Sequence, residues 1–315
     1  MKPCLKLIAL TFAVITPAQA QPQRLAPETH EVLRILHRVD VTVLVDNISG
    51  SGPVLGEWGA ALLIQTGQDQ ILFDAGEGRV LLGNARALQV DLRKTKAIVV
   101  SHNHLDHTGG LKDALEACGP VDFFIHPAGF ETGYWKEDSH AVAHSLPFSR
   151  QLLGQRVRKL IETKGPTAVC SGVMVTGQIP RLTDFEDTGL KREAFLDKDL
   201  KTPDPILDDQ ALFFRVPEGV VVVMGCGHAG LVNTLRYISE ILGQNQIYAV
   251  IGGTHLISAS AARMQKTVDA LRSYGVQKVM LSHCTGVQAY AVLANAFPGR
   301  CSWPSSGTKI QFGRQ

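Results

Sequence analysis

Apolar residues along the chain gather in short runs, and glycine, asparagine or aspartate ends most of them. Residues 41–45 are β-branched or leucine and precede Asp46-Asn47, a pattern typical of a strand that ends in a turn. The apolar runs 60–65 and 70–73 flank a polar turn at 66–69 and predict a hairpin. The same pattern predicts further strands at 97–100, 121–125, 172–176, 211–216, 220–224, 248–251 and 278–281.

Helical patterns lie in both halves of the chain. Helices are expected at 80–90, from Gly109-Gly110 to 117, at 230–242 and at 258–274. A short helix is also expected around 31–37, within an exposed lead-in. Residues 130–153 are rich in His, Trp and Ser and are predicted to be an irregular lid or substrate loop. A strand-rich first half and an alternating second half favour an α+β fold with two sheets in the middle and helices outside.

The N-terminus has the pattern of a secretory signal peptide. Lys2 and Lys6 precede a short apolar run at 7–15, and Ala18-Gln19-Ala20 matches a small-x-small cleavage site. The alternatives are a short buried helix or a membrane anchor, but the run is too short to cross a bilayer, and Pro17 interrupts it. We therefore expect a signal peptide at 1–20, a lead-in at 21–37, one domain at 38–315 and a periplasmic or secreted protein.

Composition and charge point to a globular protein that acts on a small molecule. Hydrophobic residues make up 45% and charged residues 19% of the 315 residues. The chain has 31 basic and 29 acidic residues, and loss of the signal would remove two lysines. A neutral protein lacks the basic field of nucleic-acid binders, and no other segment is apolar enough to span a membrane. Five cysteines would remain, so at least one is unpaired, metal-bound or in an intermolecular pair, and the oligomeric state stays open.

A cluster of metal-ligand residues follows the strand expected at 97–100. His102, His104, Asp106 and His107 fall within the ten residues 101–110. Imidazole and carboxylate groups bind zinc, iron or manganese. In extended backbone, His102 and His104 point the same way, and the next turn brings Asp106 and His107 nearby, so one loop can serve two ions. The alternatives are a His-rich surface loop or a helix cap at Asp106.

This cluster carries a family resemblance. The pattern His-x-His-x-Asp-His, followed by Gly109-Gly110, resembles the signature of the metallo-β-lactamase superfamily. Asp74-Ala75-Gly76 resembles that superfamily's first motif, whose aspartate buttresses the ligand loop. The resemblance implies the metallo-β-lactamase αβ/βα four-layer sandwich of two mixed sheets.

Further motifs are similar to the dihydropterin-ribofuranosyl-aminobenzene-phosphate-synthase-like group of this superfamily. They lie at 45–47, 176–181, 208–212, 225–230, 252–256 and 283–286. That group takes its name from one archaeal member, and its bacterial members are mostly generic metal-dependent hydrolases. The named reaction therefore does not carry over to this chain.

By this analogy, histidines from later strand ends complete two metal sites. His228 is expected to join His102 and His104 at the first ion, and His283 to join Asp106 and His107 at the second. The resemblance gives His255 the role of a catalytic helper, with metal ligation as its alternative. For all three histidines the competing interpretation is a core residue bonded to backbone.

The bridge between the two ions is unsettled. Cys226 stands nearest to the position where many relatives carry a bridging aspartate. Water or hydroxide alone is one alternative, and weak binding of the second ion is another. Cys226 and Cys284 flank ligand histidines, as ligands or as inert buried thiols.

Several other polar residues are weaker candidates. Arg181 and Asn47 are expected to contact substrate, and the alternative for Arg181 is a salt bridge to Glu186 or Asp184. His140 and His144 are spaced for one helix face and would contact substrate or solvent. His126 is expected to be structural, and His30 and His37 to lie on the surface.

The N-terminal signal pattern and the family resemblance together imply an exported metal-dependent hydrolase. Two divalent ions, zinc in the first instance and otherwise iron or manganese, would hold a hydroxide that attacks a small phosphoester, lactone, thioester or amide. Asp106 would orient the nucleophile or accept its proton, and His255 would protonate the leaving group. The alternatives are an iron-dependent redox or transferase enzyme on the same fold and a non-catalytic metal- or ligand-binding protein.

Overall fold

The computed structural model describes residues 33–138, 140–190 and 193–313. The expected signal peptide at 1–20 and most of the lead-in lie outside these residues, so the domain bounds stay a prediction. The expected helix at 31–37 is wrong for residues 33–37, which contain no helix. Leu36 N instead donates to Arg215 O, and Ile35 forms a β-bridge with the same residue. This segment is extended because Leu33 and Leu36 are buried in the core.

The first sheet joins both ends of the described chain. From edge to edge its strands are β17 (Lys309–Phe312), β1 (Val39–Val45), β2 (Ala61–Gln65), β3 (Gln70–Phe73), β4 (Ala97–Val99), β5 (Asp122–Ile125) and β8 (Lys159–Glu162). The strands from β17 to β3 pair antiparallel, and those from β3 to β8 pair parallel. The sheet is therefore mixed, as expected.

The second sheet has the same mixed character. Its order is β16 (Cys301–Ser302), β15 (Lys278–Leu281), β14 (Ile247–Gly252), β13 (Gly219–Met224), β12 (Ala211–Val216), β10 (Val173–Val175) and β9 (Thr167–Cys170). The strands from β16 to β13 pair parallel, and those from β13 to β9 pair antiparallel. Parallel strands end at the same sheet edge, which brings together the loops that follow β13, β14 and β15.

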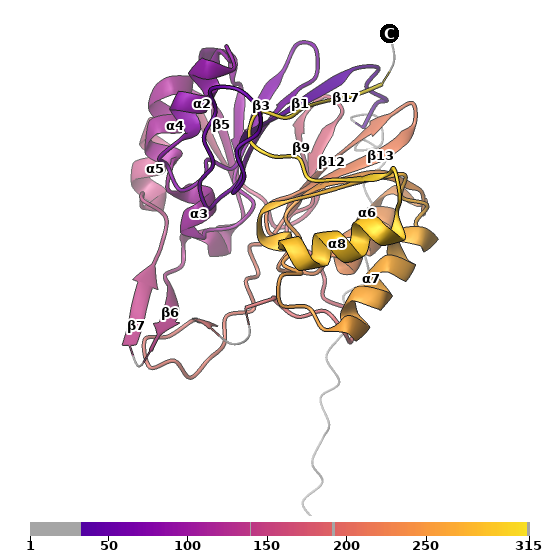
Figure 1. Ribbon diagram of the computed structural model, residues 1–315. Coiled ribbons are helices and arrows are strands. Elements are labelled where there is room, and N and C mark those ends of the chain that lie inside the picture. The colour runs from indigo at the N-terminus through magenta and orange to yellow at the C-terminus, as the bar shows by residue number, and fades with distance from the viewer. Residues whose placement is uncertain (1–32, 139, 191–192, 314–315) are drawn as a thin grey trace, which may run out of the picture.

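Helices cover the outer faces of both sheets (Figure 1). On the first sheet these are α2 (Leu81–Ala87), α4 (Leu111–Cys118) and α5 (Arg150–Arg156). On the second they are α6 (Leu231–Leu242), α7 (Ala261–Ser273) and α8 (Val287–Ala296). The short elements are α3 (Leu105–Thr108) and the 3-10 turns η1 (Leu92–Lys94), η2 (Pro127–Phe130) and η3 (His283–Thr285).

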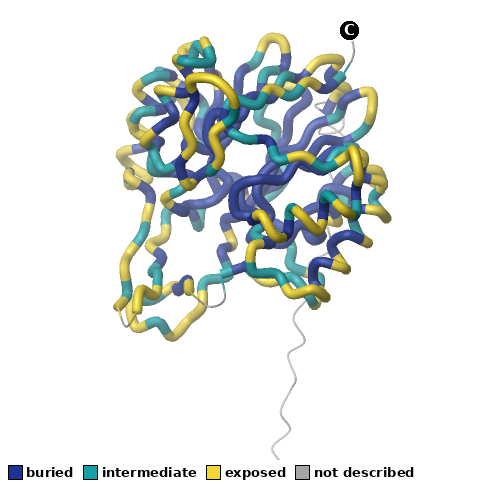
Figure 2. Tube along the Cα trace, in the orientation of Figure 1, coloured by how far each residue is buried: buried dark blue, intermediate teal, exposed yellow. Residues whose placement is uncertain are grey.

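The two sheets pack face to face and enclose the central core. Val41, Ile64 and Phe73 from the first sheet meet Val221 and other apolar residues from the second. Figure 2 shows the strands buried and the exposed positions mostly on the outer helices and loops. The expected four-layer sandwich is confirmed. No helix within the described ranges has the length and apolarity that a membrane crossing requires.

The expected irregular loop at 130–153 is wrong. This region contains β6 (Gly133–Glu137) and β7 (His140–His144), and most of α5. Together with β11 (Ala194–Phe195), β6 and β7 form a small separate sheet, which Figure 1 shows projecting from one end of the molecule. Only Gly133 is buried in β6 and β7, so these two strands lack the alternation of buried apolar residues that identifies a strand in sequence.

Candidate metal centre

The histidine-rich loop lies where β4 ends, against the turn that follows β3. Asp74 is fully buried in that turn. Its Oδ1 accepts from Ser101 N, and its Oδ2 accepts from Ser101 Oγ and from His107 Nδ1, each at 2.7 Å. The arrangement matches the buttressing position expected for Asp74. Gly110 allows the close approach of loop and turn, because a Cβ there would collide with Ala75 O.

The first cluster contains His102, His104 and His228, as expected. His102 Nε2 lies 2.9 Å from His104 Nδ1, and one ligand-type atom from each of the three residues lies within 4.8 Å of the others. The three side chains are at most 4% exposed. His228 Nε2 and His104 Nε2 are buried and lack a hydrogen-bond partner among the described residues. Orphaned buried ring nitrogens of this kind require a partner such as a cation or water.

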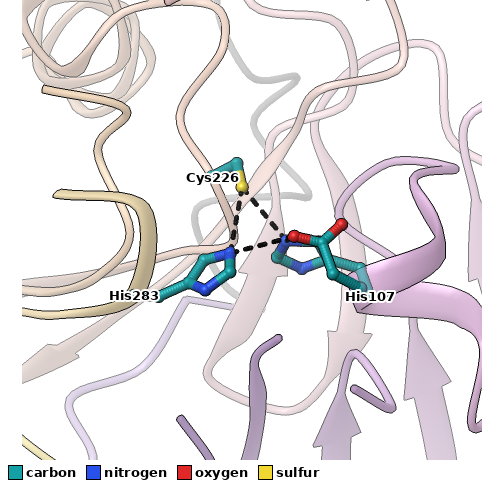
Figure 3. A group of neighbouring side chains, drawn as sticks. His107, Cys226 and His283 are labelled. Carbon is teal, nitrogen blue, oxygen red and sulfur yellow. Dashed lines mark hydrogen bonds and ion pairs between the residues drawn. The ribbon is translucent and has the colours of Figure 1, made fainter. Parts of the chain in front are cut away.

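The second cluster contains Asp106, His107 and His283, as expected, and also Cys226. Figure 3 shows the Cys226 sulfur between His107 and His283. Its Sγ lies 3.1 Å from His107 Nε2 and 3.4 Å from His283 Nε2. Asp106 Oδ2 lies 3.3 Å from His283 Nε2 and 3.7 Å from His107 Nε2. One potential metal-ligand atom from each of the four residues lies within 4.8 Å of the other three.

These spacings suit ligands that share an ion. Two nitrogens bound tetrahedrally at zinc distances lie about 3.3 Å apart, and a nitrogen and a thiolate sulfur about 3.6 Å apart. The second cluster shows 3.1 to 3.7 Å between its donors. The residues present therefore fit a bound cation in each cluster.

Hydrogen bonds at Nδ1 orient most of these imidazoles. His102 Nδ1 lies 2.9 Å from Ser101 Oγ, and His228 Nδ1 donates to Thr188 O at 2.7 Å. His107 Nδ1 donates to Asp74. With Nδ1 occupied, each ring turns its Nε2 towards its cluster, which is how proteins orient histidines for a metal.

Asn47 occupies a different position from the substrate contact expected for it. Its Oδ1 accepts from His283 Nδ1 at 2.8 Å, and its Nδ2 donates to His283 O. Its neighbour Asp46 accepts from His283 N at 3.0 Å. Both amide atoms of Asn47 are thus used to hold His283, which adopts a left-handed backbone with φ of 52°.

The two clusters differ in electrostatics. Burial and neighbouring imidazoles lower the pKa of His102 and of His228 well below its usual value, so these rings stay neutral and keep a lone pair. Burial acts in the same direction on His107, but Asp106 and Asp74 outweigh it and raise its pKa to about 9. The second cluster therefore favours positive charge at its centre.

Comparison with known proteins agrees with this geometry. A family model described as "Metallo-beta-lactamase superfamily" matches residues 59–237, which is more than half of the chain. The chain belongs to the metallo-β-lactamase superfamily.

Individual relatives of this superfamily match almost end to end. The 7,8-dihydropterin-6-methyl-4-(β-D-ribofuranosyl)-aminobenzene-5'-phosphate synthase of Methanocaldococcus jannaschii is 29% identical over 287 residues, 87% of this chain and 97% of the relative. The crystal structure of Tm1679, a metal-dependent hydrolase of the β-lactamase superfamily, superimposes with a TM-score of 0.74 and 26% identity, covering 88% of this chain and all of Tm1679.

A more distant solved structure shows the fold alone. The metallo-β-lactamase-fold protein YhfI from Bacillus subtilis matches with a TM-score of 0.54 and 15% identity, covering 87% of this chain and 99% of YhfI. Together with the match to Tm1679 and the clusters of metal-ligand residues, family membership confirms the expectation of a metal-dependent hydrolase of this superfamily.

Two expected substrate-side residues flank the first cluster of this metallo-β-lactamase-fold protein. His255 Nδ1 is buried without a hydrogen-bond partner among the described residues, and its ring centroid lies 4.4 Å from that of His228. A ligand-type atom of His255 also lies within 4.8 Å of Cys226 and His228, so helper and ligand both stay possible roles.

Arg181 lines a cavity of about 280 Å³ together with His228, Thr188 and Asp204. Its Nη2 donates to Ile206 O, and its Nε is buried without a partner in the described part of the chain. The salt bridges considered for Arg181 are not formed. Glu186 instead accepts from Val232 N and Asn233 N at the start of α6, and Asp184 pairs with Lys266.

The remaining histidines divide into structural and site-facing residues. His126 Nδ1 accepts from Ala128 N at the start of η2, the structural role expected for it. His37 is exposed, and His30 lies outside the described residues. His140 and His144 lie on strand β7, not on the expected helix face. The His144 ring centroid lies 5.3 Å from that of His104, and both its nitrogens are buried without a described partner.

Sequence reasoning missed two tryptophans that adjoin the clusters, and it left the role of Cys226 open. Cys226 was left between ligand and inert thiol, although its place beside the bridging-aspartate position was the available signal. Trp135 packs on His104 with ring centroids 4.7 Å apart, and Trp58 packs on His283 at 5.2 Å. Nothing in the local pattern at either tryptophan marks it as facing the metal centre.

Proposed function

We propose that this protein hydrolyses a small phosphoester, lactone, thioester or amide with two divalent cations, most simply zinc, at the two clusters. The observation that carries the proposal is that two sets of metal-ligand atoms lie at the spacing of ligands that share an ion. Cys226 adjoins both sets. Two cations held side by side are typical of hydrolases that clamp both the attacked group and the attacking water.

The chain's own residues would hold the cations in two sets. His102, His104 and His228 would hold the first. Asp106, His107 and His283 would hold the second with Cys226, which stands where an aspartate bridge is expected in relatives. Bound divalent cations supply a water that is activated near neutral pH and polarise the bond that it attacks.

Asp106 and His255 are the proposed reacting side chains. The Asp106 side chain is 19% exposed, whereas that of His107 is fully buried. The Asp106 carboxylate therefore lies on the open side of the cluster, where it would orient the attacking water. The orphaned His255 Nδ1 is buried beside His228, where it would contact the leaving group or the developing charge.

The surroundings of the clusters support a small substrate with an acidic group and a flat part. The cavity beside His228 has the size of a small substituent, and the buried, unpartnered Arg181 Nε offers a donor on its wall. Trp58 is 51% exposed beside the second cluster, and Trp135 adjoins the first. Aromatic walls of this kind favour contact with planar groups.

A substrate panel on metal-analysed protein tests the proposal. We expect two cations per chain by elemental analysis and turnover of at least one aryl phosphate, aryl thioester, lactone or β-lactam. His102→Ala and Asp106→Asn should lose at least about 100-fold in kcat/KM, whereas the exposed His37→Gln serves as the matched histidine control. Full turnover in His102→Ala would contradict the assignment. Iron content with oxygen uptake and no hydrolysis would replace it by redox chemistry.

Export is a separate proposal that rests on the sequence at 1–20. Lys2, Lys6, the apolar run and Ala18-Gln19-Ala20 support cleavage after Ala20 and a periplasmic or secreted location. N-terminal sequencing of the protein from an exporting bacterial host should begin at Gln21. A start at Met1 in the cytosolic fraction would contradict export and leave the hydrolase proposal untouched.

A further inference from the structure

Two buried thiols meet behind the second cluster, and the hydrolase proposal uses only one of them. Cys226 is 1% exposed and Cys284 is fully buried. The Cys284 thiol donates to the backbone carbonyl of Cys226, with 3.5 Å between Cys284 Sγ and Cys226 O. His255 N donates to Cys284 Sγ at 3.3 Å. Cys284 is thus in contact with Cys226 but is absent from the groups of donors that could hold an ion among the described residues.

The meeting of these thiols is built into the end of the second sheet. Cys226 follows β13 and Cys284 follows β15, and these strands are separated by β14. The middle strand ends at Gly252, and Gly253 follows it. Neither residue has a side chain. A Cβ on Gly253 would lie 2.7 Å from Cys284 Sγ, and one on Gly252 would collide with Met224 O. The two outer loops therefore close over the middle strand only because glycines stand there.

We propose that Cys226 and Cys284 form a reversible disulfide when the second cation site is empty, and that the cation and the disulfide exclude each other. The inference rests on the proposed second cation site, because Cys226 cannot donate its sulfur to a cation and to Cys284 at once. Formation of the disulfide would draw Cys226 Sγ away from His107 and His283, at 3.1 and 3.4 Å. The contact between Cys284 Sγ and Cys226 O brings the two residues to adjoining positions, as a disulfide requires.

The chemistry balances with hydrogen peroxide as oxidant. One thiolate attacks a peroxide oxygen, the O–O bond breaks, and a sulfenic acid and water form after proton transfer. The second thiol attacks that sulfur, the S–O bond breaks, and a second water leaves with the disulfide. Overall, two thiols lose two protons and two electrons, and one peroxide becomes two waters. The Asp106 side chain adjoins Cys226 and is 19% exposed, so peroxide would reach the thiols from this side.

Peptide mapping after graded peroxide treatment tests the inference without any activity assay. Metal-free and zinc-loaded wild-type protein receive the same peroxide dose and are then alkylated, digested and analysed by mass spectrometry. We expect the Cys226–Cys284 linked peptide in the metal-free sample and at least about 10-fold less of it in the zinc-loaded sample. Oxidised protein should also rebind about one cation fewer per chain until a dithiol reductant is added.

Two variants control the measurement. Cys284→Ala should yield no linked peptide from Cys226, while Cys118→Ala, which removes a buried cysteine of α4, should behave like the wild type. Separate oxidation of Cys226 and Cys284 without a link would overturn the inference, as would equal linkage with and without zinc in protein shown by elemental analysis to hold two cations. If the protein holds no zinc, the two-cation proposal fails, and linkage in the metal-free sample still reports on the thiol pair.

Discussion

Asp74→Asn isolates the contribution of one oxygen atom to the second cation site. Asp74 Oδ1 accepts from Ser101 N, a donor that cannot change its role, so the amide oxygen of an asparagine must face it. The amide nitrogen then replaces Oδ2, which in the wild type accepts from Ser101 Oγ and His107 Nδ1 at 2.7 Å. The Ser101 hydroxyl can rotate to accept a hydrogen bond. The imidazole of His107 can accept only by moving its proton to Nε2.

That proton would lie where the cation must bind. His107 Nε2 is the atom that faces Cys226, at 3.1 Å. To bind the cation through Nε2, His107 must return its proton to Nδ1 in the variant. This buried N–H then faces the NH₂ group of the asparagine, which costs about 1–3 kcal/mol. At about 1.4 kcal/mol per factor of ten, affinity for the second cation should fall roughly 5- to 150-fold. The first site keeps the contact between His102 Nδ1 and Ser101 Oγ, so its affinity should change much less.

Cation titration by calorimetry, with cobalt spectra to separate the sites, measures both affinities. Asp113→Asn, in α4, provides a control for the charge change at a residue outside the clusters. The expected result is a selective loss of affinity at the second site, with a circular dichroism spectrum like that of the wild type. Unchanged affinity at both sites, or a preferential loss of the first cation, would refute the tautomer argument.

Three further predictions follow from the contacts around the site. Gly110→Ala should lower the free energy of unfolding by about 1–3 kcal/mol in urea titrations, because its Cβ collides with Ala75 O. Gly83→Ala, which meets open space in α2, should be neutral or stabilising by up to about 1 kcal/mol. Trp58→Ala should raise KM about 2- to 10-fold for aryl substrates at unchanged cation content, and an unchanged KM would remove Trp58 from the substrate wall. Burial raises the pKa of Asp208 to about 7 from 3.8, so its contribution to stability is complete below about pH 4 and is lost as pH rises through about 7. Metal-free Asp208→Asn should therefore gain up to about 4 kcal/mol on the wild type between pH 4 and 8, and a pH-independent difference would contradict the shifted pKa.

Local spacing was sufficient to predict the parts of the site that one segment builds. His102 and His104 alternate along extended backbone after β4, and Asp106 and His107 lie in the following turn of helix. The partners His228 and His283 come from distant segments, yet each follows a buried strand of the parallel half of the second sheet. Because parallel strands end at one edge, their proximity to the loop was predictable from strand order.

Contacts set only by tertiary structure could not be predicted in this way. The side chain of Asn47 appeared available for substrate in sequence, but it is used by His283, which is 236 residues away. Strands β6 and β7 have one buried residue between them, and they are ordered by pairing with each other and with β11. The approach of Trp135 and His144 to His104 follows from that hairpin, so no periodicity in residues 130–153 reveals it.

Residues from both halves of the sandwich build the site, and the segment 208–210 forms hydrogen bonds to both sets of them. Asp208 Oδ2 accepts from Asn103 N at 2.8 Å, between the two histidines of the ligand loop. Asp209 Oδ2 accepts from Ala229 N at 2.8 Å, directly after His228. Gln210 completes the link through its bonds to Val100 O and Ser101 O. None of these three residues belongs to the two clusters of ligand residues, so chelation should leave the sandwich folded. Bound cations would add links between the same two halves, and their binding free energy would then appear directly as stability against unfolding.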